Sequence, residues 1–286
     1  MTIASIEKVF IEDLTALYDA REAGSIAWLV IGFVCKINRS QYLKNKHDAL
    51  SEKQLAVFYT ILSELKKGMP VQYVLEETEF YGLVFKVNSN VLIPRPETEE
   101  LVDWVLKDVN VLKHEKKTLK VLDTGTGSGC IAISLKKNLP QADIFALDIS
   151  NKALEVAKEN AELNNTPIFF LNNDILKIEK VGESFDIVIS NPPYVTLTEK
   201  GSMHSNVLDF EPHTALFVPD DNALIFYNAI ADFALNNLAP GGLLYLEINE
   251  NLGPQTVALL KRKGFITLEL RKDLRDRNRM LKAQLY

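Results

Sequence analysis

The sequence is poor in the residues that build disulfides and metal sites. Its 286 residues contain two cysteines, Cys35 and Cys130, which lie far apart in the chain. This excludes a disulfide framework and a zinc ligand spacing, and it fits a reducing compartment. The four histidines are scattered without the spacing of a metal motif. We therefore expect no metal centre.

The sequence also lacks a basic charge balance and a long apolar run. The formal net charge is −6, whereas proteins held on nucleic-acid phosphates usually carry a basic surface. We therefore expect no stable binding to nucleic acid. The most apolar early stretch, residues 25–34, is too short to span a bilayer, and the N-terminus does not resemble a signal peptide. The expected location is the cytoplasm, away from membranes.

The sequence does contain enough apolar material for two domains, since 47% of its residues are hydrophobic. Residues 1–75 repeat apolar side chains at spacings of three and four, which predicts an N-terminal helical bundle domain. Within it, Ser51 marks a helix start and Gly68 the end of the last helix. Residues 76–95 alternate apolar and polar side chains and predict a β-hairpin linker. Residues 96–286 form the second predicted domain.

The second domain alternates predicted strands and helices. A helix begins near residues 94–98, and from residue 119 onward apolar runs alternate with amphipathic stretches. This alternation predicts an α/β fold, in which a mainly parallel sheet is covered by helices on both faces. The predicted strands are residues 119–124, 143–148, 168–171, 185–190 and 242–248, and the later helices are expected around residues 131–135, 151–164, 221–237 and 254–263.

A glycine-rich turn follows the first of these strands. Gly125, Gly127 and Gly129 alternate there with Thr126 and Ser128. Glycines at this place permit a tight turn and let a ligand approach the backbone closely. The spacing is Gly-x-Gly-x-Gly, whereas dinucleotide-binding proteins show Gly-x-Gly-x-x-Gly. The turn is a candidate cofactor site, and a tight turn without a ligand is the alternative.

Acidic residues follow the next two strands. Asp148 ends its strand 19 residues after Gly129, where a carboxylate accepts from both ribose hydroxyls of a bound nucleoside. The alternative is a helix cap for the segment that follows. Asp174 and Ile175 come after the third strand. They are candidates to accept from an adenine amino group and to cover the ring, with an ordinary loop acid as the alternative.

The tetrapeptide Asn191-Pro192-Pro193-Tyr194 follows the fourth strand. Its prolines stiffen the turn and lack backbone donors. The Asn191 amide and the Pro192 carbonyl are two acceptors that together hold both N–H bonds of a planar –NH2 group, and Tyr194 is placed to stack on its flat face. This pattern predicts catalysis by positioning a poorly nucleophilic nitrogen. A proline-rich turn without function is the alternative.

Together, the glycine turn and the Asn-Pro-Pro-Tyr tetrapeptide resemble methyltransferases that modify planar nitrogens. These include DNA adenine, ribosomal RNA guanine and release-factor glutamine methyltransferases. Further segments resemble the last family, and the Ile-Pro-Arg-Pro-Glu-Thr segment is the most specific of them. The resembling segments are residues 68–73, 79–82, 91–99, 121–134 and 211–216.

The resemblance implies a seven-stranded Rossmann-like methyltransferase domain that uses S-adenosylmethionine. Its protein partner would be a bacterial class I peptide chain release factor, methylated on the glutamine of its Gly-Gly-Gln motif. Residues 125–129, Asp148, Ile175 and Asn191 would then line the cofactor site, and residues 191–194 would hold the glutamine.

Two other functions are compatible with the sequence. A nucleic-acid methyltransferase of the same fold would flip a base into the same pocket and needs a basic recognition surface, which the acidic balance disfavours. A degenerate methyltransferase acting as a binding scaffold is disfavoured because Asn191 and Asp148 are both present.

Overall fold

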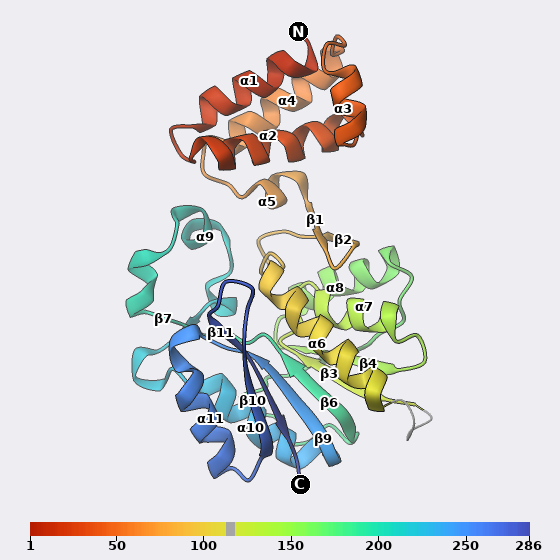
Figure 1. Ribbon diagram of the computed structural model, residues 1–286, viewed down its shortest axis with the longest axis vertical. Helices are drawn as coiled ribbons and strands as arrows, with labels where there is room; N and C mark the ends of the chain where they lie inside the picture. Colours follow the sequence, from red (N-terminus) through yellow and green to blue (C-terminus); the bar gives the residue numbers. More distant parts are fainter. Residues whose placement is uncertain (113–117) are drawn as a thin grey trace. The chain divides into compact units, whose positions relative to one another are not determined.

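The structure is a computed structural model that describes residues 1–112 and 118–286. The chain divides into two compact units, whose elements are labelled in Figure 1. The first holds Met1–Glu77 and His204–Phe210, and the second holds Thr78–Met203 and Glu211–Tyr286. The first unit is therefore not one continuous stretch of sequence, because a short internal segment belongs to it as well.

Helices build the first unit, as the spacing of its apolar residues predicts. In one apolar cluster Phe10 packs edge-on against Phe58, with 5.9 Å between ring centroids. Ser51 caps its helix, because its side chain accepts from the backbone N–H of Gln54. Beyond Gly68, where the last helix was expected to end, one more short helix forms. The helices are α1 (Ile3–Leu14), α2 (Ala20–Cys35), α3 (Arg39–Asn45), α4 (Glu52–Leu65), α5 (Val71–Leu75) and α9 (Ser205–Phe210).

A two-stranded hairpin lies where the linker was expected. It pairs β1 (Glu77–Phe80) with β2 (Leu83–Lys86), and no strand continues through residues 87–93. The Asn160 side chain accepts from the Lys86 N–H at 2.6 Å and donates to the Lys86 carbonyl at 2.9 Å. The hairpin is thus fastened to a helix of the second unit.

A seven-stranded sheet forms the centre of the second unit, with the order β10-β11-β9-β6-β3-β4-β5. The pairs from β9 to β5 are parallel, while β11 runs antiparallel to both of its neighbours. The sheet confirms the expected α/β class. Its strands are β3 (Lys120–Thr124), β4 (Asp143–Asp148), β5 (Phe169–Asn172), β6 (Phe185–Ser190), β9 (Leu238–Glu247), β10 (Ile266–Lys272) and β11 (Asn278–Gln284).

Helices cover both faces of this sheet (Figure 1). Neighbouring residues of β3 point to opposite faces, so Val121 joins one apolar cluster and Leu122 the other. The cluster around Val121 includes α6 (Pro96–Leu112), α7 (Cys130–Asn138) and α8 (Asn151–Leu163). The cluster around Leu122 includes α10 (Ile225–Asn237) and α11 (Gly253–Arg262).

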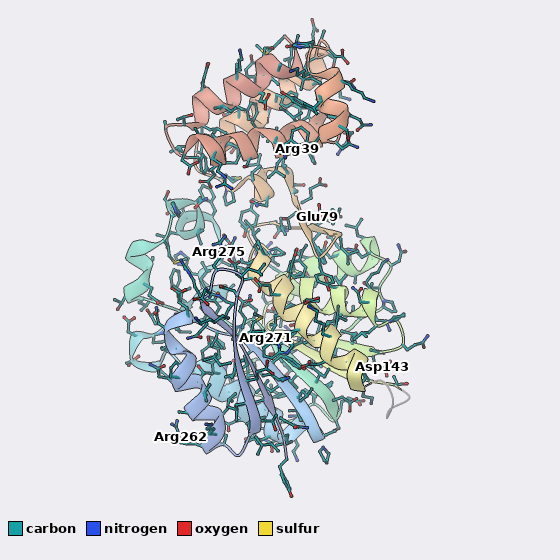
Figure 2. The ribbon with its side chains drawn as sticks, in the orientation of Figure 1. Arg39, Glu79, Asp143, Arg262, Arg271 and Arg275 are labelled. Atoms are coloured by element: carbon teal, nitrogen blue, oxygen red, sulfur yellow. The ribbon has the colours of Figure 1, made fainter. Side chains whose placement is uncertain are left out.

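The C-terminal hairpin closes one edge of the sheet. Arg271 of β10, labelled in Figure 2, places its guanidinium carbon 3.8 Å from the ring centroid of Trp104 on α6. Such a cation–π contact covers the buried indole with a solvated group. The remaining short elements are β7 (Val195–Thr196), β8 (Phe217–Val218) and the 3-10 turns η1 (Thr198–Ser202), η2 (His213–Ala215), η3 (Asp220–Asn222) and η4 (Glu250–Leu252).

Within residues 1–112 and 118–286, no helix has the length and apolar character that crossing a membrane requires. In the same described part of the chain, no cluster of three or more histidine, cysteine, aspartate or glutamate side chains is arranged to hold a metal ion.

Candidate active site

The loops that follow β3, β4, β5 and β6 line one cavity of about 470 Å³. They meet there because the carboxyl ends of neighbouring parallel strands lie at one edge of the sheet. Two predicted site residues, Gly129 and Tyr194, are not among those that line it. The predicted residues that do line the cavity are Gly125, Thr126, Gly127, Ser128, Asp148, Asp174, Ile175, Asn191, Pro192 and Pro193.

The glycines of the turn serve two different purposes. Gly127 has a φ of 53°, and an added Cβ would meet nothing within 4 Å, so its backbone is open to the cavity. Gly129 has a φ of 82°, and an added Cβ would lie 2.9 Å from Ile133 Cδ1 and 3.2 Å from Ala157 Cβ. Gly129 therefore allows α7 and α8 to pack closely, whereas Gly127 leaves room for a ligand.

Asp148 connects the glycine turn to the start of α8. Its Oδ2 accepts from the Gly127 N–H at 2.9 Å and its Oδ1 accepts from the Ser150 N–H at 2.9 Å. Burial raises the pKa of the Asp148 carboxyl, and these backbone donors oppose the rise. Ser150, not Asp148, caps α8 by accepting from the Ala153 N–H. Each carboxylate oxygen keeps acceptor capacity for a ligand hydroxyl at the cavity.

Asp123, the last acidic residue before the turn, is fully buried. It accepts a hydrogen bond from the Thr126 hydroxyl at 2.6 Å. Burial raises the pKa of the Asp123 carboxyl to about 7, although that hydrogen bond acts in the opposite direction. The Asp123 carboxyl therefore stabilises the turn through Thr126 and does not line the cavity.

Asn191 occupies the cavity wall at the end of β6. Its Nδ2 donates to the Thr98 hydroxyl oxygen at 3.0 Å, and that hydroxyl donates to Glu247 Oε2 at 2.6 Å. Asn191, Thr98 and Pro192 all line the cavity, whereas Glu247 lies behind them and is 1% exposed. Burial raises the pKa of the Glu247 carboxyl, and the hydroxyls that donate to it oppose the rise.

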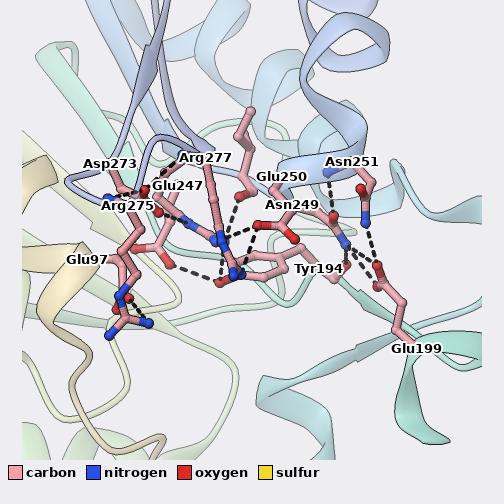
Figure 3. Close-up of polar contacts among 12 residues, drawn as sticks. Glu97, Tyr194, Glu199, Glu247, Asn249, Glu250, Asn251, Asp273, Arg275 and Arg277 are labelled. Atoms are coloured by element: carbon pink, nitrogen blue, oxygen red, sulfur yellow. Dashed lines mark hydrogen bonds and ion pairs between the residues drawn. The ribbon is translucent and has the colours of Figure 1, made fainter. Parts of the chain in front are cut away.

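Tyr194 does not line the cavity and belongs to a cluster of polar contacts (Figure 3). Its hydroxyl donates to Glu247 Oε1 at 3.0 Å and accepts from Arg279 Nη1 at 3.4 Å. Burial raises the pKa of the Tyr194 hydroxyl well above its usual value. Its hydroxyl is thus engaged away from the cavity, and the stacking role expected for its ring stays a prediction.

The segment before α6 forms another part of the wall, through residues that include Val91, Pro94 and Arg95. Arg95 Nη2 pairs with Glu211 Oε1 at 2.5 Å, and the Ile93 N–H donates to the same carboxylate at 3.2 Å. Glu211 is buried, so these bonds hold the start of the Ile-Pro-Arg-Pro-Glu-Thr segment in place at the edge of the cavity.

The sequence patterns assign no role in the site to Thr98 or Glu247. Glu247 carried a signal, because it is an acid between Leu246 and Ile248 in an otherwise apolar strand. Buried acids of this kind need donors, but the sequence does not show which. The apolar wall from α10, which includes Phe226 and Ile230, carried no comparable signal.

Comparisons with known proteins agree with this description. The family model "Methyltransferase small domain" matches residues 108–209, and the model "PrmC N-terminal domain" matches residues 13–75. Among solved structures, a methyltransferase from Pyrococcus furiosus has a TM-score of 0.50 at 16% identity, covering 82% of this chain and 98% of that one. The hMettl16 catalytic domain has a TM-score of 0.56 at 16% identity, covering 82% and 83%. These two show the fold alone.

Curated relatives match almost the whole chain. The release factor glutamine methyltransferase of Flavobacterium psychrophilum is 46% identical over 99% of this chain and 99% of that protein. The one of Bacteroides thetaiotaomicron is 39% identical over 95% of this chain and 96% of that protein.

Fold and site together define a Rossmann-like methyltransferase whose cofactor is S-adenosylmethionine. The residues fit this cofactor, because an open glycine turn and a buried carboxylate line a largely apolar cavity, as a nucleoside with a charged tail requires. Within that class, the chain belongs to the release factor glutamine methyltransferase family.

Proposed function

We propose that this chain transfers the methyl group of S-adenosylmethionine to the side-chain amide nitrogen of the glutamine in the Gly-Gly-Gln motif of class I peptide chain release factors. One observation carries the proposal. The Asn191 side chain and Pro192 line the same cavity as the glycine turn and Asp148. The names of the relatives support the choice of a release factor as substrate.

The substrate nitrogen determines what the protein must do. An amide nitrogen is planar and a poor nucleophile because its lone pair is delocalised. We infer that Asn191 Oδ1 and the Pro192 carbonyl accept its two N–H bonds and direct its lone pair into the cavity. These acceptors also stabilise the positive charge that develops on the nitrogen. The methylated nitrogen then loses a proton readily, so the site needs no strong general base.

The remaining predicted residues are assigned to the cofactor. We propose that residues 125–129 approach it through their backbone and that Asp148 accepts from its ribose hydroxyls. Asp174 would accept from the adenine amino group and Ile175 would cover the ring. When bound, S-adenosylmethionine supplies a methyl group on a positively charged sulfur. We further propose that the reaction takes place in the cytoplasm without stable binding to nucleic acid, consistent with free Cys35 and Cys130.

The experiment that tests this function offers the chain two substrates in parallel. Cofactor labelled in its methyl group is incubated with the protein and either a purified release factor or total nucleic acid. We expect label on the Gly-Gly-Gln glutamine and none on nucleic acid. Label on adenine or guanine amino groups instead would favour the nucleic-acid methyltransferase. Cofactor binding without transfer to either would favour the scaffold.

Asn191→Ala tests the role of the tetrapeptide. Alanine removes one acceptor and leaves a substrate N–H without a partner, so we expect the single-turnover rate at saturating cofactor to fall about a hundred- to a thousandfold. Asn191→Asp keeps an acceptor but adds charge and loses the donor, so its rate should fall between those of the wild type and the alanine variant. An alanine variant within about tenfold of wild type would mean that the tetrapeptide is only a turn.

A further inference from the structure

We propose that Thr98 and Glu247 are positioning residues that hold the Asn191 amide in one of its two orientations, with Oδ1 toward the substrate nitrogen. This inference rests on the proposed function, because it concerns the acceptor that the methylation reaction needs. Neither residue transfers a group or a proton. They act through Asn191.

Three elements contribute to this arrangement. Thr98 belongs to the first turn of α6, Glu247 ends β9, and Asn191 follows β6. Thr98 is 2% exposed and Glu247 is 1% exposed. Thr98 Oγ1 lies 2.6 Å from Glu247 Oε2 and 3.0 Å from Asn191 Nδ2. Both contacts have the length of ordinary hydrogen bonds.

The number of protons in this chain fixes its direction. The Thr98 and Tyr194 hydroxyls and the charge of Arg279 favour the ionised form of Glu247. An ionised carboxylate only accepts, and a threonine hydroxyl has one proton. Because the Thr98 proton is committed to Glu247, Thr98 Oγ1 can only accept from Asn191. The –NH2 end of the Asn191 amide must therefore face Thr98. A flipped amide would set Asn191 Oδ1 against Thr98 Oγ1 with no proton between them, which leaves two acceptors facing each other.

The second oxygen of Glu247 holds the other end of the tetrapeptide. Glu247 Oε1 accepts from the Tyr194 hydroxyl at 3.0 Å. Arg279 donates to the same hydroxyl at 3.4 Å and is itself paired with Asp273 at 3.2 Å. Figure 3 shows Glu247 and Tyr194 in this cluster. One buried carboxylate thus restrains the tetrapeptide at both ends, directly at Tyr194 and through Thr98 at Asn191.

Thr98→Val is the first test, because valine has the shape of threonine but no hydroxyl. We expect the single-turnover rate at saturating cofactor to fall about ten- to a hundredfold, as when the support of a catalytic group is lost. Cofactor affinity should stay within about twofold. Thr98→Ser keeps the hydroxyl and should restore most of the rate. The matched control is Thr256→Val in α11, which removes another fully buried hydroxyl outside the cavity and should leave the rate unchanged.

A double-mutant cycle separates orientation from general stability. If Thr98 acts through Asn191, adding Thr98→Val to Asn191→Ala should lower the rate by a further factor below about three. A full additional loss in the double variant would overturn the inference. So would a Thr98→Val rate equal to that of wild type.

An NMR measurement tests the orientation without using activity. The side-chain amide signals of Asn191 are those that disappear in Asn191→Ala. In the wild-type chain we expect one of these protons to be hydrogen-bonded and protected from exchange, and Thr98→Ser should preserve that protection. Rapid exchange of both protons in the wild type would overturn the inference even if Thr98→Val failed to fold. A wild-type chain that shows the protection but does not methylate a release factor would instead contradict the proposed function.

Discussion

At the scale of single residues, Asp148 serves two parts of the site at once. It accepts from the Gly127 N–H in the glycine turn and from the N–H of Ser150, the residue that caps α8. The carboxylate therefore shapes the turn even before a ligand hydroxyl reaches it. Its removal should affect both the shape of the cavity and the contacts made there.

We expect Asp148→Ala to weaken cofactor binding, because the charge-assisted hydrogen bonds that we propose between Asp148 and the ribose would be lost. The cost should be about 1.5–3 kcal/mol, roughly ten- to a hundredfold in dissociation constant. Titration calorimetry measures it. Asp143→Ala is the matched control, because Asp143 lies at the opposite end of the same strand (Figure 2). A folded Asp148→Ala variant whose affinity lies within about twofold of wild type would rule out the assignment.

Asp123 leads to a prediction about pH. Its carboxyl has a pKa of about 7 in the folded chain and about 3.9 when unfolded. The folded state thus favours the protonated form, so this contribution to stability is complete below about pH 4 and is lost as pH rises to about 7. The loss amounts to about 4 kcal/mol.

Asp123→Asn should remove this loss, since an asparagine oxygen still accepts from Thr126 and carries no charge. The free energy of unfolding, measured with urea from about pH 4 to about pH 7, should fall less in the variant than in the wild type. Asp221→Asn, at an exposed position, should follow the wild-type slope. Identical slopes for wild type and Asp123→Asn would contradict the prediction.

Among the elements, the turn between β3 and α7 must both allow close packing of helices at Gly129 and leave room for a ligand at Gly127. Substitution of each glycine tests these two roles separately. Gly129→Ala adds a Cβ 2.9 Å from Ile133 at a positive φ, which should lower the free energy of unfolding by about 2–4 kcal/mol. Gly127→Ala meets open space, so only its positive φ costs stability, about 1–2 kcal/mol.

The two variants should rank in the opposite order for cofactor affinity. The added methyl group of Gly127→Ala enters the cavity, whereas that of Gly129→Ala enters the helix packing. Urea unfolding and calorimetry of both variants test the pair. Equal losses of cofactor affinity in the two variants would mean that Gly127 and Gly129 do not have separate roles.

The parallel strands could be predicted from sequence because each is a short apolar run that ends at a recognisable turn. The expected strands at 119–124 and 185–190 are confirmed as β3 and β6. The antiparallel strands β10 and β11 were missed. Their connecting loop, residues 273–277, contains no glycine or proline, and Asp276 takes the positive φ of 64° that glycine often supplies.

In the site, too, local motifs could be predicted from the sequence, whereas contacts between distant residues could not. The glycine turn and the Asn-Pro-Pro-Tyr tetrapeptide are local motifs, so their loops could be placed before the fold was known. The hydrogen bonds that support Asn191 could not be predicted, because Thr98 and Glu247 stand 149 positions apart in the sequence. Only the packing of α6 beside β9 brings that hydroxyl and that carboxylate together.

At the scale of the whole molecule, the cavity belongs to the second unit alone. Every residue that lines it falls within 78–203 or 211–286. The family model for the N-terminal domain matches residues 13–75, which belong to the first unit. We propose that the first unit offers a binding surface to the protein substrate. A protein substrate needs such a surface, because a stable protein complex buries about 800 Å² per partner, far more than one glutamine side chain provides.

We therefore expect that deleting residues 1–75 leaves cofactor affinity within about twofold while methylation of an intact release factor falls at least a hundredfold. A short peptide containing Gly-Gly-Gln supplies the control, because it has no surface for the first unit to recognise. The truncated and full-length chains should methylate this peptide at similar, low rates. Calorimetry reports whether the truncated chain, which retains residues 204–210 without their helical partners, still folds and binds cofactor. If it does, and if it methylates the intact release factor at the full-length rate, then the first unit does not recognise the substrate.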